Sequence, residues 1–266
     1  MVRYSVNEVM LDGATLADDV AMLVELRVPA MGVDRRKLLA AGVEEGARLL
    51  ADAPIDVYFL QGGGPFTLTD RSRWPAEIDA FRRAIDDAAA IGAGCLQVTI
   101  GSPGPLSYEE AEACFLELLE AVLPHAEANQ VVLAPEHNHA LRMDLGYIHT
   151  LHDALDLADA VDSPWFGVCG EVNNAWIERH LYDNLARRHG RIPLMQINDF
   201  AAGTLCTPER VALGEGIIPL ERIITTMVHA GYAGWFDLEV VGTQVREQGA
   251  RAVVERSLAW LRRLEV

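Results

Sequence analysis

A chain of 266 residues, half of them hydrophobic, is long enough to bury one large core and shows no sign of disorder or low complexity. Its 22 basic and 39 acidic side chains give a formal net charge of −17, which opposes binding to nucleic-acid phosphates and to anionic lipid surfaces. No secretory signal and no run of about 20 apolar residues is visible, so we expect a cytoplasmic protein without a transmembrane helix.

Short apolar runs alternate with amphipathic helical patterns along the whole chain. Eight runs are the expected strands: Tyr4–Val9, Ala30–Val33, Val57–Leu60, Cys95–Ile100, Val131–Ala134, Phe166–Cys169, Pro193–Ile197 and Trp235–Val240. Eight strand–helix units without a linker predict one (β/α)₈ TIM barrel domain over residues 1–266. An open doubly wound sheet would need a GxGxxG turn after the first strand, where the chain has only Gly13.

Two smaller patterns give further expectations. Ser107 and Glu110 have the spacing of a capping box, which predicts the start of a helix there. The cysteines are scattered without metal-site spacing, so we expect reduced and mostly buried thiols at Cys95, Cys114, Cys169 and Cys206.

Polar residues gather at the ends of the last four predicted strands, the face on which barrel enzymes carry their active sites. Strand five is followed by a glutamate, strand six by another, strand seven contains a glutamine and strand eight a third glutamate. Because these strands are neighbours, we expect four side chains to converge: Glu136, Glu171, Gln196 and Glu239. Three carboxylates repel one another unless a cation lies between them, and oxygen ligands favour Mn²⁺ or Mg²⁺.

The same segments resemble the xylose-isomerase-like TIM barrels, the sugar phosphate isomerase/epimerase superfamily. The resemblance covers nearly the whole chain and is strongest from Val131 to Val241. The stretch from Arg210 to Pro219 is similar to the family's Arg…Gly-x-Gly-x-x-Pro loop, and Ala230–Gly234 to its Gly-Tyr-x-Gly turn. It implies that the four side chains bind one divalent ion, Mn²⁺ first and Mg²⁺ or Co²⁺ as alternatives. It also implies a homo-oligomer, and a partner subunit remains an open alternative.

The resemblance further implies a reaction on a small carbohydrate. Proton removal next to a carbonyl, through a metal-stabilised enediolate, gives isomerisation or epimerisation. Glu136 and Glu239 are then acid/base groups, and His139 is an additional or alternative base. Arg210 is expected to hold a substrate oxygen and Asn174 a hydroxyl. Many family members have histidine at the positions of Asn174 and Gln196.

Other functions stay open at this point. His139 also matches a subgroup that cleaves 3-oxo-glycosides by β-elimination, so a metal-dependent lyase or dehydratase of keto-sugars is the alternative. A DNA-repair endonuclease is disfavoured by the charge of −17 and by the missing histidine on strand seven. A non-catalytic binding barrel is a third possibility.

Several further residues receive weaker expectations. Asp199 is expected to orient the metal ligands through hydrogen bonds without binding the metal itself. Residues 61–66 are expected to determine which substrate binds. Three aromatic residues either line the pocket or pack in the core: Phe66, Trp74 and Trp176. No functional role is expected for the histidines at helix ends and in charged segments: His125, His149, His152, His180, His189 and His229.

Overall fold

The computed structural model describes residues 2–11, 13, 15–204 and 206–264. Within them, eight parallel strands form the centre: β1 (Tyr4–Asn7), β2 (Ala30–Asp34), β3 (Asp56–Gly63), β4 (Cys95–Val98), β5 (Val132–Pro135), β6 (Cys169–Glu171), β7 (Leu194–Ile197) and β8 (Trp235–Leu238). They pair in the order β5-β4-β3-β2-β1-β8-β7-β6. Two isolated parallel bridges, Leu133–Phe166 and Glu136–Cys169, join β5 to the segment of β6. The arrangement confirms the predicted (β/α)₈ barrel.

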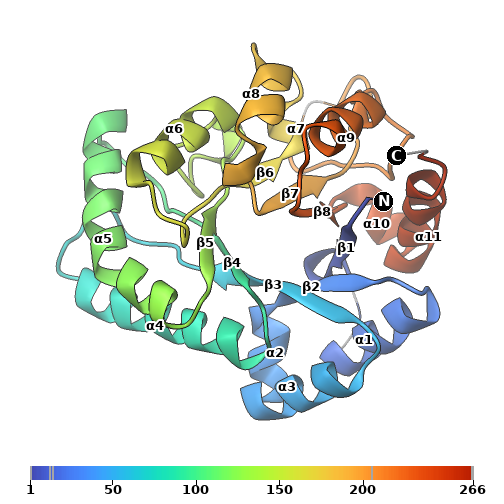
Figure 1. Cartoon of the computed structure of the whole chain (residues 1–266), viewed down its shortest axis with the longest axis horizontal. Coiled ribbons are helices and arrows are strands. Elements are labelled where there is room, and N and C mark those ends of the chain that lie inside the picture. Colours follow the sequence, from blue (N-terminus) through green and yellow to red (C-terminus); the bar gives the residue numbers. More distant parts are fainter. Residues whose placement is uncertain (1, 12, 14, 205, 265–266) are drawn as a thin grey trace.

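Helices surround the strands (Figure 1). They are α1 (Leu16–Glu25), α2 (Arg35–Ala41), α3 (Val43–Asp52), α4 (Trp74–Ala90), α5 (Tyr108–Ala128), α6 (Leu151–Val161), α7 (Val172–Ala175), α8 (Leu181–Arg187), α9 (Leu220–His229), α10 (Thr243–Gln248) and α11 (Ala250–Leu261). Short 3₁₀ turns lie at η1 (Glu8–Met10), η2 (Ala140–Arg142) and η3 (His189–Arg191). None of the helices in the described residues combines the length and apolar character that crossing a membrane requires.

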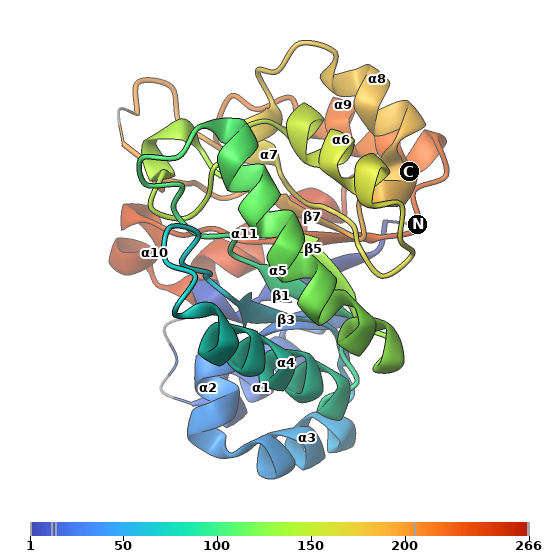
Figure 2. The same ribbon diagram turned by 90° about the vertical axis from the view of Figure 1, so that its left-hand side faces the viewer.

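The longest two helices, α4 and α5, pack against each other on one flank of the barrel (Figure 2). The capping box that starts α5 is confirmed, because Ser107 Oγ accepts from the Glu110 backbone at 3.3 Å and Glu110 Oε2 accepts from the Ser107 backbone at 2.8 Å. Its buried residues recur at helical spacing and are Ala111, Phe115, Leu118, Leu119, Val122 and Ala126.

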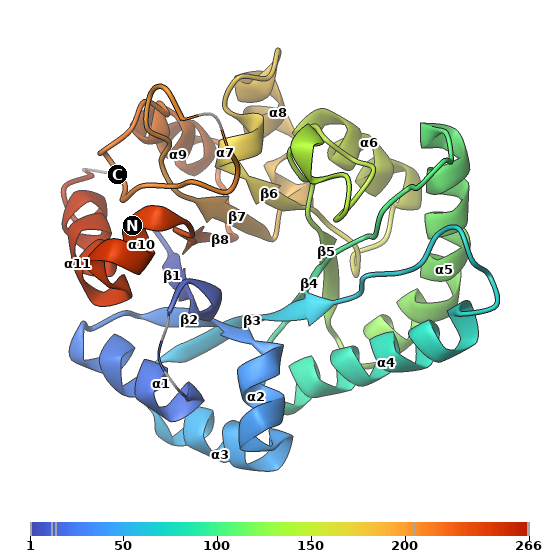
Figure 3. The same cartoon turned by 180° about the vertical axis from the view of Figure 1, so that it is seen from behind.

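The barrel interior is filled with apolar side chains up to the level of the site. A cluster from five different strands consists of Phe59, Cys95, Ala134, Cys169 and Leu194. Gly32 on β2 makes room for it, since a Cβ atom there would stand 2.0 Å from Cζ of Phe59. The cavity described below opens at the carboxyl-terminal end of the barrel, where α10 and the long loops lie (Figure 3).

Two expectations about the elements need correction. Strand six was predicted over Phe166–Cys169, but regular pairing with β7 begins only at Cys169, opposite Leu194. The backbone of Val168 donates instead to the carbonyl of Arg191 at 2.8 Å. Glu171 is the last residue of β6, as expected from the polar residue that ends this run. All four cysteines are free, but only Cys95 and Cys169 are fully buried, whereas Cys206 is exposed.

Candidate active site

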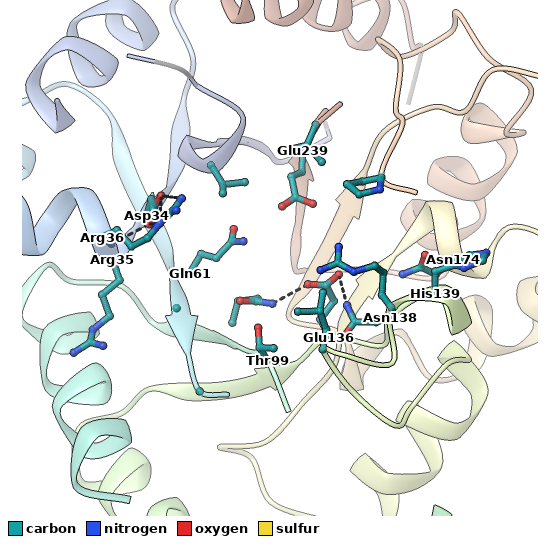
Figure 4. A pocket seen from close by; sticks show the side chains of 18 of the residues that line it. Asp34, Arg35, Arg36, Gln61, Thr99, Glu136, Asn138, His139, Asn174 and Glu239 are labelled. Atoms are coloured by element: carbon teal, nitrogen blue, oxygen red, sulfur yellow. Dashed lines mark hydrogen bonds and ion pairs between the residues drawn. The ribbon is translucent and has the colours of Figure 1, made fainter. Parts of the chain in front are cut away.

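A cavity of about 710 Å³ opens at the carboxyl-terminal end of the barrel. Five of the seven predicted site residues line it: Glu136, His139, Asn174, Arg210 and Glu239. Glu136 and Glu239 both extend into the cavity, from the ends of β5 and β8 (Figure 4). Gln61, Gly62 and Gly64 of the predicted substrate-selecting loop also form part of its wall. The other two predicted residues, Glu171 and Gln196, are completely buried.

Strand register explains why Glu171 and Gln196 are neighbours. Glu171 on β6 is paired with Gln196 on β7, and Gln196 is paired with Asp237 on β8. Aligned residues of a parallel sheet point to the same face, so these three side chains lie on the same face of neighbouring strands. Glu239 lies two residues beyond Asp237 on the same face, one step nearer the cavity.

The buried guanidinium of Arg210 links two of the predicted ligands. Its Nη2 lies 2.8 Å from Oε2 of Glu171, and its Nη1 contacts Oε2 of Glu239. Nη1 also donates to the carbonyl oxygen of Glu239 at 3.2 Å. Among the side chains that the structure describes, no three or more of the His, Cys, Asp and Glu types form a group that could hold a metal ion. In this structure Arg210 therefore bridges two of the predicted ligands, Glu171 and Glu239.

Burial and mutual repulsion dominate the electrostatics of the carboxylates. Burial, with Glu239 and Glu171 nearby, raises the pKa of Glu136 to about 8. Burial likewise raises the pKa of Glu171 to about 7, although Arg210 opposes the shift. Glu136 accepts from Nε2 of Gln97 at 2.8 Å and from Nδ2 of Asn138 at 3.1 Å, which fixes the orientation of its carboxylate.

The chemistry of these residues fits a divalent cation. Neither amide atom of the buried Gln196 has a hydrogen-bond partner in the described structure, and such an orphaned oxygen is costly unless a ligand uses it. When ionised, the three glutamates and Arg210 carry a formal charge of −3 + 1 = −2, which one divalent cation cancels. Each carboxylate has about four acceptor positions and is contacted by at most three donors, so acceptor positions remain.

His139 lies at one side of the cavity, next to Asn174 (Figure 4). Its Nδ1 accepts a hydrogen bond from the backbone N–H of Leu141 at 3.1 Å. In the neutral ring the proton is therefore on Nε2, which can only donate a hydrogen bond. The predicted role of His139 as a base requires the hydrogen bond between Leu141 and Nδ1 to open. Asn174 donates through Nδ2 to the carbonyl of His137 at 2.9 Å, which holds it at the cavity wall.

Sequence reasoning missed a ring of amides around the glutamates. Besides Gln97 and Asn138, Asn198 donates to Oε1 of Glu171 at 2.8 Å. Asn7 donates to Oε1 of Gln61 at 2.7 Å and lies 3.5 Å from Oε1 of Glu239. Asn7 and Gln97 each interrupt an apolar run near the end of a predicted strand, a signal that was present in the sequence.

Several other residues named in the sequence analysis hold loops in place or pack in the core. The carboxylate of Asp199 accepts from the backbones of Gly214, Gly216 and Ile218 at 2.9 to 3.0 Å, so it shapes the loop after β7 instead of orienting the ligands. Phe66 stacks on Phe81 in the core. Two more keep loops in place: Trp74 donates to the carbonyl of Thr67, and His149 contacts the carbonyl of Asn138.

Known proteins resemble this chain over most of its length. The family described as xylose isomerase-like TIM barrel matches residues 21–264. The L-ribulose-5-phosphate 3-epimerase UlaE of Shigella flexneri serotype 5b is 26% identical over 227 residues, which cover 83% of this chain and 74% of that enzyme. Enzymes of the same name from other Shigella and Escherichia coli strains match over 60–61% of their length, so the chain spans less than two thirds of them.

Solved structures show the same fold. A protein of Sinorhizobium meliloti 1021 is 28% identical, with a TM-score of 0.91 and 98% of each chain covered. A crystal structure of the IolI protein, described as binding a zinc atom, is 16% identical, with a TM-score of 0.83 over 97% of this chain and 96% of that one. At that identity the second likeness concerns the fold alone.

Proposed function

Because the chain belongs to the xylose isomerase-like TIM barrel family, we propose that it is a sugar isomerase or epimerase that moves a proton next to a carbonyl with the help of one divalent metal ion. The observation that carries the proposal is the pair of carboxylates, Glu136 and Glu239, that enter one cavity from the ends of two strands. The match to an enzyme named as a ribulose-phosphate epimerase supports a carbohydrate substrate.

Two carboxylates at one cavity suit an exchange of one proton. One carboxylate takes the proton from the carbon beside the carbonyl, and the other returns a proton to the opposite face or to the neighbouring carbon. Gln97 and Asn138 hold Glu136 in a single orientation, and a pKa raised to about 8 increases its ability to hold a proton near neutral pH.

Four side chains would hold the metal: Glu136, Glu171, Gln196 and Glu239. When bound, a divalent cation supplies positive charge beside the substrate carbonyl as the proton leaves. The choice between Mn²⁺, Mg²⁺ and Co²⁺ is part of the proposal, with Mn²⁺ first. Arg210 lines the cavity and has five N–H donors, so it can hold a substrate oxygen while it keeps its contacts with Glu171 and Glu239.

A β-eliminating lyase is the second candidate, and the hydrogen bond of His139 favours it. With the proton on Nε2, the ring at the cavity wall can give a hydrogen bond or a proton to an oxygen that leaves the substrate. Glu136 or Glu239 takes the proton from the carbon beside the carbonyl, and the electrons of that carbon–hydrogen bond form the new carbon–carbon double bond as the bond to the leaving oxygen breaks. The leaving oxygen departs with the Nε2 proton of His139, and a proton from water restores the neutral ring.

Incubation in D₂O with Mn²⁺ tests both candidates. The substrates would be a panel of ketoses, 3-oxo-glycosides and keto-inositols, and the products would be followed by NMR and mass spectrometry. An isomerase or epimerase gives isomers that carry deuterium next to the carbonyl, and a lyase gives loss of water or of the aglycone. Failure of every substrate to incorporate deuterium, with metal demonstrably bound, would refute proton transfer as the reaction.

A further inference from the structure

An apolar groove of about 510 Å³ lies beside the catalytic cavity. It is built from the loops that follow β5, β6 and β7, and four hydrophobic side chains form much of its wall: Leu141, Trp176, Ile177 and Phe200. Leu141 and Ile177 are 68% and 72% exposed, which makes them the two most exposed large hydrophobic residues among those described. Exposed hydrophobic side chains that lie together mark a binding site, whereas single exposed hydrophobic residues are normal on a protein surface.

The groove adjoins the catalytic cavity. His139, Asn174 and Thr207 line both of them, so these residues stand at the junction. A molecule whose polar part contacts Glu136 and Glu239 can therefore extend past His139 into the groove. The size of the groove suits a small-molecule group, because ligand pockets commonly measure about 300–1,000 Å³.

The charges of the catalytic cavity argue against a substrate recognised by a phosphate. Four arginines line it, and each already contacts a carboxylate: Arg35 with Asp87, Arg36 with Asp34, Arg142 with Asp144, and Arg210 with Glu171 and Glu239. No lysine is among the described residues of this wall. Every arginine of the cavity thus already has an acidic partner, and the wall also offers amide groups that can bind hydroxyls, with an apolar surface beside it.

We propose that the groove binds a hydrophobic substituent of the substrate, so that the substrate class is a sugar carrying an aryl or alkyl group and not a sugar phosphate. The proposal rests on the proposed function, because it requires the sugar part to occupy the catalytic cavity. His139, Asn174 and Thr207 then face the bond that joins the sugar to its substituent.

Binding of matched glycosides tests the groove without requiring turnover. The probes are the 4-nitrophenyl and methyl β-glycosides of D-glucose, D-galactose and D-xylose, titrated into the full-length protein with Mn²⁺ by calorimetry. For at least one sugar, the 4-nitrophenyl glycoside is expected to bind about tenfold or more tightly than its methyl counterpart, because its ring leaves water. Equal affinities throughout the panel, or no binding at all, would overturn the proposal.

Substitutions locate the effect. Leu141→Asp and Ile177→Asp are expected to bring the ratio of the two affinities close to one, with the affinity for the methyl glycoside preserved. Ile217→Asp is the matched control, since Ile217 is 47% exposed and lines neither cavity, and it should leave the ratio unchanged. A ratio that survives both groove substitutions would place the aryl group elsewhere and contradict the proposal.

Three outcomes separate this proposal from its alternatives. If Ile177→Asp splits an oligomer in light scattering and leaves the affinity ratio intact, the groove is a subunit interface and the proposal is overturned. If the ratio behaves as expected but no substrate exchanges deuterium, the groove is supported and the proposed reaction fails. Deuterium exchange without any preference for the aryl glycosides refutes the groove alone.

Discussion

Replacing Gln196 by leucine is expected to change stability and metal binding in opposite directions. The amide is completely buried, and neither of its polar atoms has a partner among the described residues. A buried unsatisfied polar group costs about 1–3 kcal/mol, and leucine is an apolar residue of similar size. The free energy of unfolding of the metal-free Gln196→Leu protein should therefore rise by about that amount, or about 2–4 °C per kcal/mol in the melting temperature.

The same substitution removes one proposed metal ligand. With Mn²⁺ at 100 times its dissociation constant, the wild-type protein should gain about 2.7 kcal/mol, and the Gln196→Leu protein should gain clearly less at the same concentration. Differential scanning calorimetry in EDTA and in Mn²⁺ measures both effects.

Gln97→Leu is the matched control, because this buried amide donates to Glu136 at 2.8 Å. Its loss should lower the stability of the metal-free protein by about 1–3 kcal/mol. Destabilisation by Gln196→Leu in EDTA would show that its amide is satisfied after all. Equal stabilisation of wild type and Gln196→Leu by Mn²⁺ would show that Gln196 is no ligand.

Three further predictions concern the charged residues. In EDTA at pH 8, Arg210→Met should lower the free energy of unfolding by about 3–5 kcal/mol, because buried Glu171 and Glu239 lose their counter-charge. The control Arg251→Met removes exposed ion pairs and should cost less than about 1 kcal/mol. Similar melting temperatures for the two variants would refute a counter-charge role of Arg210. The pKa values of Glu136 and Glu171, about 8 and 7, lie above the ordinary 4.5, so the folded metal-free protein holds extra protons and its stability should fall between about pH 5 and 8. The affinity for Mn²⁺ should rise over the same pH range, because those protons leave the ligands. Denaturation in EDTA measures the stability and calorimetric titration measures the affinity, each at four pH values, and a flat or opposite trend in either would contradict the prediction. Glu239→Gln should lower kcat about 10²–10⁴-fold in a protein that still folds, and a loss below tenfold would remove Glu239 as an acid/base group.

The barrel and the positions of the glutamates could be predicted because both follow from local pattern. Eight apolar runs specify buried parallel strands, and a polar residue at the end of such a run must lie at the barrel mouth. Glu136 and Glu239 satisfied that rule directly. Strand six did not begin where its apolar run begins, because Val168 pairs with Arg191 before the ladder to β7 starts at Cys169.

The charge arrangement and the groove could not be predicted, because they depend on loops. Arg210 is 39 residues from Glu171 and 29 from Glu239 in the sequence. It reaches them in a loop that also depends on three backbone hydrogen bonds to Asp199. Leu141 and Ile177 look like ordinary core residues in the sequence, and only their place in the two segments that follow β5 and β6 leaves them exposed beside the cavity.

Crystals grown with Mn²⁺ and measured at the manganese absorption edge test the central claim most directly. The account predicts one anomalous peak at the carboxyl-terminal end of the barrel, in contact with oxygen atoms of Glu136, Glu171, Gln196 and Glu239. A peak elsewhere, or an Arg210 guanidinium that still separates the carboxylates with no ion among them, would contradict it.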